Sequence, residues 1–332
     1  MRCRVPSVGC QVLSRHLSCV CAASSAGFAW RILAALTISF LAGCHSREHS
    51  EVAVYTSQDQ VYAEPILKEF TRETGIQVKA LYDSEAIKTV GLVNRLLAER
   101  NHPQCDLFWN NEELRTRQLA AQNVFREVNS WRAVGFRSRR IVINTNHVSL
   151  ASAPRSLSEL TNATWRRKIA LAYPLFGTTA THFLALRHHW DEAVWRTWCE
   201  RLQANEPFLL DGNSVVVKQV GRGEAWIGLT DSDDIAAGQR EGLPLLGLPI
   251  GEESLLIPNT IAVVSGAPHR DAAEKLFEYL QRPAVLEKLV AANALEGLSP
   301  TEFSATTLKP DWDALVYELE AGTKALKEIF LR

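Results

Sequence analysis

The sequence predicts an α/β fold built largely from parallel β-sheets, and two observations lead to this prediction. From residue 51 onward, short runs rich in β-branched and aromatic residues alternate with longer stretches whose apolar residues recur at helical spacing. This alternation is typical of strand–helix–strand units, in which the helices cover a parallel sheet. The chain has 332 residues and is 46% hydrophobic, so it can bury one or two large cores.

Residues 51–110 read as two strand–helix units followed by a third strand. The pattern predicts strands at residues 51–56, 76–81 and 106–109 and helices at residues 62–74 and 85–100. Gly75 directly follows the first helix, and we expect it to end that helix in the left-handed conformation, which glycine adopts without steric cost.

The same alternation starts again in the middle of the chain and ends in a group of helices. It predicts strands at residues 168–172, 208–210, 224–229 and 255–264 and helices at residues 191–203, 214–220, 271–281, 283–292 and from 311 onward. Another helix is expected to open at residues 177–181 (GTTAT). Pro283 suits the first position of its helix, where a missing N–H group leaves no hydrogen bond unmade.

The first fifty residues differ in composition from the rest of the chain. Arginines precede an apolar run at residues 32–42 (ILAALTISFLA), and this run ends at Gly43 and Cys44. The order is that of a secretory signal peptide, and the run is shorter than the roughly 20 apolar residues that span a bilayer core. We therefore expect an exported protein without a permanent membrane span.

The end of the apolar run indicates a lipid anchor. Residues 41–44 (LAGC) resemble a bacterial lipobox, so we expect residues 1–44 to be a lipoprotein signal peptide that ends at a lipidated Cys44. Residues 45–50 (HSREHS) would then be a polar linker. The alternative is an ordinary signal peptide in which Cys44 is an incidental thiol. The long stretch before Arg31 would be explained by a translation start downstream of Met1.

Charge and motifs exclude two classes of protein. The formal net charge is -1 and no long basic run occurs, so the chain lacks the electrostatic footprint of a nucleic-acid-binding protein. It also lacks a His-Glu-x-x-His zinc motif, a phosphate-binding loop and a Gly-x-Ser-x-Gly elbow. We therefore expect a protein that is not an enzyme and has no resident cofactor.

Two cysteines remain beyond the predicted leader, Cys105 and Cys199. Two cysteines far apart in sequence do not make a disulfide framework, so we expect buried free thiols. The alternative is a single disulfide between them, which an oxidising compartment would allow.

Seven segments carry a resemblance to a known family. They are residues 54–59 (VYTSQD), 80–85 (ALYDSE), 106–112 (DLFWNNE), 174–182 (PLFGTTATH), 211–214 (DGNS), 223–231 (GEAWIGLTD) and 257–260 (IPNT). In their order and spacing they resemble the substrate-binding proteins of ferric-iron-type ABC importers, which have the type II periplasmic binding protein fold. The resemblance covers nearly all of residues 51–300.

The resemblance implies two α/β lobes joined by two hinge strands. Residues 51–140 and 261–332 would form lobe 1 and residues 141–260 lobe 2, with hinges near residues 139–144 (RRIVIN) and 258–261 (PNTI). The polar loops of the seven segments directly follow predicted strands, and open α/β sheets bind ligands beyond the carboxyl ends of their strands. We therefore expect a solute site in the cleft between the lobes.

Polar residues in these loops are the candidate ligand contacts. The candidates are Ser57, Gln58, Asp59, Asn110, Gly177, Thr178, Thr179, Asn213, Asp231, Asp233 and Asp234. Because free backbone N–H groups at the start of a helix bind anions, residues 177–179 are also expected to hold a small anion, as the resembled family commonly does there. The alternative is that the hydroxyl and carboxylate side chains only cap helices.

The acidic residues decide which solute we expect. In the resembled family, an adjacent pair of tyrosines ligates Fe³⁺ at the place that Asp233 and Asp234 take here. The family's histidine in the first loop is replaced by Asp59, and its mid-chain tyrosine falls near Thr178. The usual tyrosine-rich site cannot form, but the carboxylates of Asp59, Asp233 and Asp234 can provide an oxygen-only site for iron or another hard cation.

Together these features predict an extracytoplasmic solute-binding lipoprotein that acts as a monomer. It would close around iron, another metal ion or a metal–anion complex and deliver it to an ABC permease and its ATPase, at the periplasmic or extracytoplasmic face of the membrane. The alternatives are a binder of a small organic solute (a phosphonate, a carboxylate or a cation) and a lipoprotein that senses its solute for a signalling partner. For an anionic organic solute, a basic residue such as Arg139 should face the cleft in place of carboxylates.

Overall fold

The computed structural model describes residues 50–83, 90–126, 131–299 and 307–331. Among these residues the strands are β1 (Glu51–Thr56), β2 (Gln77–Tyr82), β3 (Leu107–Asn110), β4 (Trp131–Asn144), β5 (Ile169–Ala172), β6 (Phe208–Leu210), β7 (Ile227–Asp231), β8 (Leu245–Leu248) and β9 (Leu256–Val263). The predicted leader with Cys44, and the start of the helix predicted at residues 85–100, lie outside the described residues.

The helices of the described residues separate these strands along most of the chain. They are α2 (Gln60–Thr74), α3 (Val90–Glu99), α4 (Glu113–Ala121), α5 (Gly177–Trp190), α6 (Glu192–Ala204), α7 (Asn213–Gly221), α8 (Ser232–Arg240), α9 (Arg270–Leu280), α10 (Pro283–Ala291) and α11 (Trp312–Phe330). None of them combines the length and apolarity that a membrane crossing requires.

The strands of the described residues join in the order β2-β1-β3-β9-β4-β7-β5-β6, and β8 pairs with β4. The pairs at the two ends of this order, β1 with β2 and β3 and β5 with β6 and β7, are parallel. The central strands β9 and β4 pair antiparallel with their neighbours. The predicted α/β class is therefore confirmed, with parallel units on either side of an antiparallel centre.

Strand β4 passes from one sheet into the other. Its residues from Trp131 to Ser138 pair with β9, whereas its residues from Arg139 to Asn144 pair with β7 and β8. We call the sheet of β1, β2, β3 and β9 with its helices lobe 1, and the sheet of β5, β6, β7 and β8 with its helices lobe 2. The change of partner at Arg139 falls within the hinge that the resemblance implied at residues 139–144.

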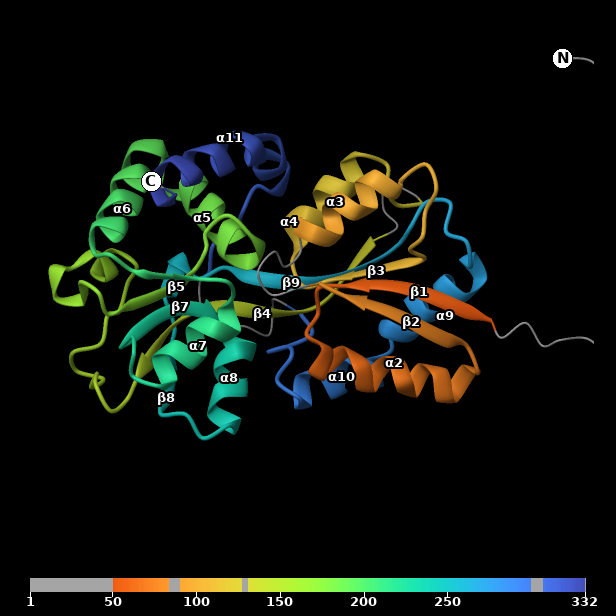
Figure 1. Cartoon of the computed structure of the whole chain (residues 1–332), viewed down its shortest axis with the longest axis horizontal. Coiled ribbons are helices and arrows are strands. Elements are labelled where there is room, and N and C mark those ends of the chain that lie inside the picture. Colours follow the sequence, from red (N-terminus) through yellow and green to blue (C-terminus); the bar gives the residue numbers. More distant parts are fainter. Residues whose placement is uncertain (1–49, 84–89, 127–130, 300–306, 332) are drawn as a thin grey trace, which may run out of the picture. The chain divides into compact units, whose positions relative to one another are not determined.

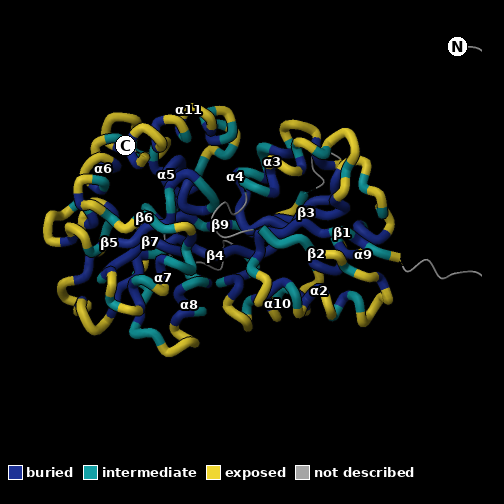
Figure 2. Tube along the Cα trace, viewed as in Figure 1, coloured by how far each residue is buried: buried dark blue, intermediate teal, exposed yellow. Residues whose placement is uncertain are grey.

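Each sheet is covered by helices on both faces (Figure 1). In lobe 1, α2, α9 and α10 pack on one face and α3 and α4 on the other. In lobe 2, α5, α6 and α11 cover one face and α7 and α8 the other. This layering explains why the strands read as continuous apolar runs, since both faces of a parallel sheet are buried. Figure 2 shows buried strands between helices with exposed outer faces.

Alternate residues of one strand enter opposite cores, as the two-residue period of a strand requires. In β5, Ile169 and Leu171 join the core under α5 and α6, where they meet Phe183, Trp195 and Trp198. Ala170 and Ala172 face the other way, against Val216 and Val220 of α7. The three tryptophans at helical spacing in residues 190–198 thus serve packing.

Several local predictions are confirmed. Strand β1 has the predicted bounds, and Gly75 ends α2 with a φ of 76°, its N–H donating to the carbonyl of Thr71. Pro283 occupies the start of α10. Cys105 and Cys199 are buried free thiols.

The helix at the end of the chain, α11, packs against α5 and α6 of lobe 2 and also against α4 of lobe 1. Leu315, Leu319, Leu326 and Phe330 of α11 belong to the same core as β5, β7 and α5. The assignment of residues 261–332 to lobe 1 and the other domain bounds stay predictions, and α11 contacts elements of both lobes.

Strand β4 has an irregularity at Gly135, where a side chain would clash with neighbouring atoms. The register of β4 against β9 shifts between Ala133 and Phe136, and Gly135 there has a φ of 75°. A Cβ at Gly135 would lie 2.5 Å from Leu295 Cδ1 and 2.9 Å from the carbonyl oxygen of Gly297. A Cβ at Gly75, whose φ of 76° is nearly equal, would meet nothing within 4 Å.

We predict that Gly135→Ala lowers the free energy of unfolding by about 3 kcal/mol and Gly75→Ala by about 1 kcal/mol. Both variants bear the cost of a positive φ, but only Gly135→Ala also adds a steric clash beside the hinge. Urea unfolding of the two variants and the parent measures the difference. Equal decreases in the free energy of unfolding for the two variants would show that the backbone around Gly135 can relax to accept a methyl group.

Candidate functional site

A small cavity lies where loops of the two lobes meet. Its volume is about 30 Å³, room for about two water molecules. Lobe 1 contributes Asp59 and Asn111, and strand β4 contributes Arg137. Lobe 2 contributes three loops that follow β5, β6 and β7, with the residues Ala172, Tyr173, Phe176, Gly177, Thr178, Thr179, Asp211, Gly212, Asn213, Asp231, Asp233 and Asp234. These loops lie at the carboxyl ends of strands, where such sheets bind ligands.

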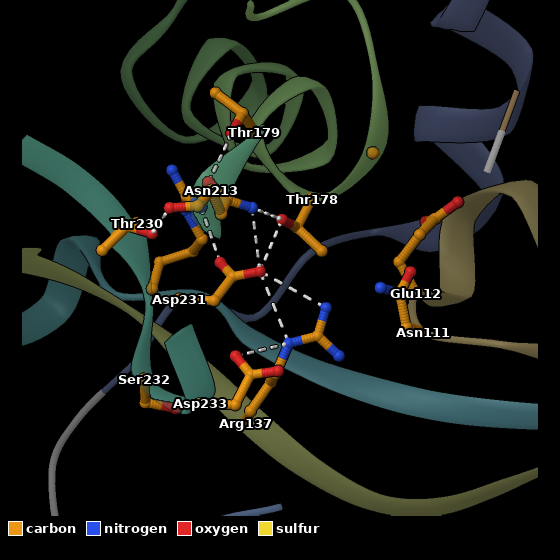
Figure 3. Close-up of polar contacts among 12 residues, drawn as sticks. Asn111, Glu112, Arg137, Thr178, Thr179, Asn213, Thr230, Asp231, Ser232 and Asp233 are labelled. Carbon is orange, nitrogen blue, oxygen red and sulfur yellow. Dashed lines mark hydrogen bonds and ion pairs between the residues drawn. The ribbon is translucent and has the colours of Figure 1, made fainter. Parts of the chain in front are cut away.

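Asp231, at the end of β7, is the centre of a buried ionic cluster (Figure 3). Its Oδ1 accepts a hydrogen bond of 2.6 Å from Arg139 Nη1, and its Oδ2 lies 3.3 Å from Arg137 Nη2. The strand register explains the contact, because Arg139 stands opposite Asp231 in the β4–β7 ladder. Arg137 is two residues away on the same face of β4. At most 2% of any of these three side chains is exposed.

Lobe 2 completes the coordination of Asp231. Thr178 Oγ1 donates to Asp231 Oδ2 at 2.7 Å, and Asn213 Nδ2 donates to the same oxygen at 3.1 Å. Burial acts to raise the pKa of Asp231, but the guanidinium groups of Arg139 and Arg137 and the Thr178 hydroxyl outweigh it and hold the pKa below its ordinary value. Asp231 is therefore ionised, and it ties together the three loops of lobe 2 that line the cavity.

Arg137 connects this cluster with lobe 1. Its Nε lies 3.2 Å from Asp233 Oδ1, and its Nη1 donates to Asn259 Oδ1 at 2.8 Å. Asn259 Nδ2 in turn donates to Gln58 Oε1 at 2.7 Å. Burial acts against the positive charge of Arg137, but Asp233 and Asp231 outweigh it and raise the pKa of the guanidinium. A buried polar chain thus runs from the cavity through both crossing strands to the loop after β1.

Carboxylates dominate the cavity. Oxygen atoms of Asp231, Asp233 and Asp234 lie within 4.8 Å of one another, and the last two belong to the first turn of α8, where the helix dipole favours negative charge. Asp211 and, from lobe 1, Asp59 line the same cavity. The cavity therefore has five carboxylates, and two guanidinium groups lie near them, those of Arg137 and of Arg139 behind Asp231. The formal charge of this group of side chains is an excess of three negative charges.

The loop side chains around the cavity are not used as helix caps. Asp59 and Asp231 stand at the N-cap positions of α2 and α8, yet neither side chain makes a capping hydrogen bond. Helix α5 likewise begins after Phe176 without a side-chain cap, and the hydroxyls of Thr178 and Thr179 turn to Asp231 and Asn213. Side-chain capping therefore does not account for the positions of these residues.

The predicted ligand residues of lobe 1 are divided between the cavity wall and the buried interior. Asp59 lines the cavity, whereas Ser57 and Asn110 are buried, and Ser57 Oγ donates to Asn110 Oδ1 at 2.6 Å. Asn110 Nδ2 also donates to the carbonyl of Glu112, so this amide holds the loop after β3. The side-chain amide of lobe 1 that lines the cavity belongs to Asn111, one residue beyond the predicted Asn110.

Two hydrogen bonds join the lobes on either side of the cavity. Thr181 Oγ1 in α5 donates to Glu112 Oε2 at 3.2 Å, and Arg240 Nη2 at the end of α8 donates to the hydroxyl of Tyr62 in α2 at 2.7 Å. Glu112 is fully buried, and burial raises the pKa of its carboxyl. These two contacts hold lobe 1 against lobe 2 in this structure.

Sequence reasoning missed Arg137, Asn111, Asp211 and Tyr173 as cavity residues. Arg139, which an anion site would require to face the cleft, is buried behind Asp231 instead. The spacing of Arg137 and Arg139 could have indicated this role. Residues two apart in a strand point to the same face, and two buried guanidinium groups there require a carboxylate partner. Their partner, Asp231, is more than ninety residues away.

The chain belongs to the bacterial extracellular solute-binding proteins, a family whose model matches residues 51–292. The major ferric iron-binding protein of Neisseria gonorrhoeae is 23% identical over 304 residues, which cover 84% of this chain and 90% of that protein. The corresponding protein of Neisseria meningitidis is also 23% identical, over 305 residues. The resemblance to the ferric-iron-type group is confirmed, and the relatives are binding proteins rather than enzymes.

Solved structures confirm the type II periplasmic binding protein fold. Iron-bound HitA from Pseudomonas aeruginosa has a TM-score of 0.73 at 17% identity and covers 84% of this chain and 99% of its own. AfuA from Actinobacillus pleuropneumoniae, solved with fructose-6-phosphate, has a TM-score of 0.74 at 16% identity and covers 85% and 99%. Structures with this fold thus hold chemically different solutes.

His182 is a buried histidine close enough to Arg139 and Asp231 to feel their charges. It is fully buried in α5, and its Nε2 lies 2.7 Å from the carbonyl oxygen of Glu253. Burial, followed by the nearby Arg139, lowers the pKa of His182 to about 3. The imidazole is therefore neutral in the folded protein at any pH above that value.

We predict a pH-dependent loss of stability from His182. A histidine in the unfolded chain has a pKa near 6.5, so between pH 6 and 4.5 the unfolded chain binds a proton that the folded chain excludes. As the pH is lowered through this range, the free energy of unfolding therefore decreases by up to about 1.4 kcal/mol per pH unit. His182→Gln, which keeps a donor for Glu253, should reduce this fall by about 2 kcal/mol over that range. Urea unfolding at several pH values measures it.

The matched control is His188→Gln, since His188 is an exposed histidine of the same helix. This variant should follow the parent at every pH. If His182→Gln and the parent lose stability in parallel as the pH falls, His182 is not the excluded proton site.

Proposed function

We propose that this protein is an extracytoplasmic receptor that captures a hard metal cation, with Fe³⁺ as the first candidate, between its two lobes for delivery to an ABC importer. The observation that carries the proposal is the charge of the cavity: five carboxylates from both lobes against two guanidinium groups. The relatives support Fe³⁺ as the first candidate, because the Neisseria proteins are ferric iron-binding proteins.

The charge distinguishes cationic from anionic solutes. A phosphate, phosphonate or carboxylate in this cavity would meet Asp59, Asp233 and Asp234 at close range, and like charges about 4 Å apart cost about 4 kcal/mol per pair near a protein surface. Arg137 offers little compensation, because Asp231, Asp233 and Asn259 already surround its guanidinium. A cation would gain the same energy that an anion would lose.

The ligands would be Asp233 and Asp234 from lobe 2 and Asp59 from lobe 1, with the amide oxygen of Asn111 nearby. Oxygen-only donors suit Fe³⁺, Mn²⁺, Ca²⁺ and Mg²⁺. Asp231 would order these residues, since its oxygens already accept hydrogen bonds from four side chains. The start of α5, at Gly177 and Thr178, would hold a small anion beside the metal, where its N–H groups favour negative charge.

Capture would work by hinge closure. A cation held by Asp59 and by Asp233 makes contacts with both lobes at once, and these contacts exist only when the lobes are together. Binding would therefore shift the population toward the closed clamp, in which Thr181 meets Glu112 and Arg240 meets Tyr62. The permease would recognise this form.

Delivery would take place at the membrane. The leader pattern and the lipobox-like residues 41–44 support export and attachment through Cys44, which would keep the receptor close to its permease and ATPase. Within this proposal the protein acts as a monomer on the periplasmic or extracytoplasmic face.

The same charge also suits a small cationic organic solute, which is the alternative function. The volume of the cavity, about 30 Å³, favours a single ion over an organic molecule in the closed form. A receptor that presents its closed form to a signalling partner would use the same site and the same closure.

We predict that ferric citrate or Mn²⁺ at about 100 times its Kd raises the melting temperature by about 5 °C or more, and that Asp233→Asn abolishes this shift because it removes a ligand charge. Thermal unfolding of protein purified in chelator measures it. Asp271→Asn is the matched control, since Asp271 also lies in the first turn of a helix but is exposed.

Comparing Asp233→Asn with Asp271→Asn separates the loss of a metal ligand from the loss of a negative charge elsewhere on the protein. Asp271→Asn should keep the full shift. Stabilisation by cationic amines but not by any metal would replace the metal with an organic solute, and stabilisation by phosphate compounds would contradict the charge argument itself.

A further inference from the structure

Among the described residues that line the cavity, Arg137 carries the positive charge. Only 2% of its side chain is exposed, and it comes from the strand that crosses between the lobes rather than from a flexible loop. A cation-binding cavity with a fixed cation in its wall needs a physical explanation, because that charge repels the solute.

The contacts of Arg137 fix its position on three sides. Its Nη2 and Nε lie 3.3 and 3.4 Å from Asp231 Oδ2, and its Nε lies 3.2 Å from Asp233 Oδ1. Its Nη1 donates to Asn259 Oδ1 at 2.8 Å. Asp231 has a second strong partner in Arg139, at 2.6 Å, so its charge is compensated without Arg137. The position of Arg137 therefore matters most for Asp233.

We infer that Arg137 is a resident counter-cation that limits how tightly the cavity binds a solute cation. This inference rests on the proposed function and adds the residue that sets the affinity of the site. While no solute is bound, the guanidinium neutralises part of the carboxylate cluster and keeps Asp233 in place. A solute cation must compete with that guanidinium for Asp233 and is repelled by it.

The attraction of an ion to the carboxylates and its repulsion by the guanidinium both grow in proportion to the charge of the ion. Arg137 therefore weakens the binding of every cation by Asp59, Asp233 and Asp234. It keeps the affinity of the cavity below the value that the carboxylates alone would give.

The test measures Mn²⁺ binding by electron paramagnetic resonance of the free ion, on chelator-treated full-length protein. Arg137→Gln should bind Mn²⁺ at least about tenfold more tightly than the parent, because removing one unit charge about 4 Å from the ion is worth more than a factor of ten at protein-surface polarity. Arg137→Lys keeps the charge and should stay within about threefold of the parent.

Arg140→Gln is the matched control. Arg140 belongs to the same strand, but its side chain is 26% exposed and pairs with Glu296 outside the cavity. This variant should bind Mn²⁺ as the parent does. Circular dichroism reports whether each variant is folded, and Arg137→Met, which keeps the packing of the side-chain stem, serves as a second neutral variant if Arg137→Gln does not fold.

The outcomes separate the inference from the proposed function. Metal binding by the parent, with equal or weaker Mn²⁺ binding by both neutral variants, would overturn the role of Arg137 and leave the metal receptor standing. If neither the parent nor the neutral variants bind Mn²⁺ or ferric citrate, the receptor proposal fails and the inference fails with it.

Discussion

The pairing of Asp231 with Arg137 and Arg139 is the interaction on which the site depends. It lies where strand β4 changes partners, so it joins the hinge to the carboxyl end of β7. Breaking a buried ion pair from one side costs about 3–5 kcal/mol, because the remaining charge is left without compensation. The loops after β5 and β6 are attached to the same carboxylate through Thr178 and Asn213.

This cluster also determines the net charge of the cavity that a solute would meet. Two guanidinium groups satisfy Asp231 and part of Asp233, and the carboxylates of Asp59, Asp211 and Asp234 leave the cavity negative. Within the proposed function, a cation between Asp59 and Asp233 would offset the repulsion between these carboxylates of the two lobes. The proposed receptor would therefore recognise its solute by charge rather than through a large apolar pocket.

Much of the fold could be predicted because strand and helix periods are local properties. The bounds of β1, the glycine that ends α2, and the proline that begins α10 all follow from residues within one turn of the chain. Strand β4 was predicted only in part, since Gly135 and the arginines interrupt its apolar pattern and are compensated by residues far away in sequence. Helix α4 and strand β8 were not predicted.

The site was predicted to the level of its loops but not of every side chain. Asp59, Gly177, Thr178, Thr179, Asn213, Asp231, Asp233 and Asp234 all line the cavity, because loops after parallel strands converge whatever their sequence. Asn111 rather than Asn110 faces it, since the last residue of β3 still pairs with Thr260 and points its amide into the loop. Such a choice between neighbours depends on three-dimensional pairing that no local pattern contains.

The most direct test of the account is a crystal structure of the protein grown with ferric citrate, with diffraction data collected on both sides of the iron absorption edge. We expect one anomalous peak between the carboxylates of Asp59, Asp233 and Asp234, with both lobes in contact with it. An empty cavity under these conditions, or an anion seated there in place of the metal, would contradict the claim that this clamp closes on a cation.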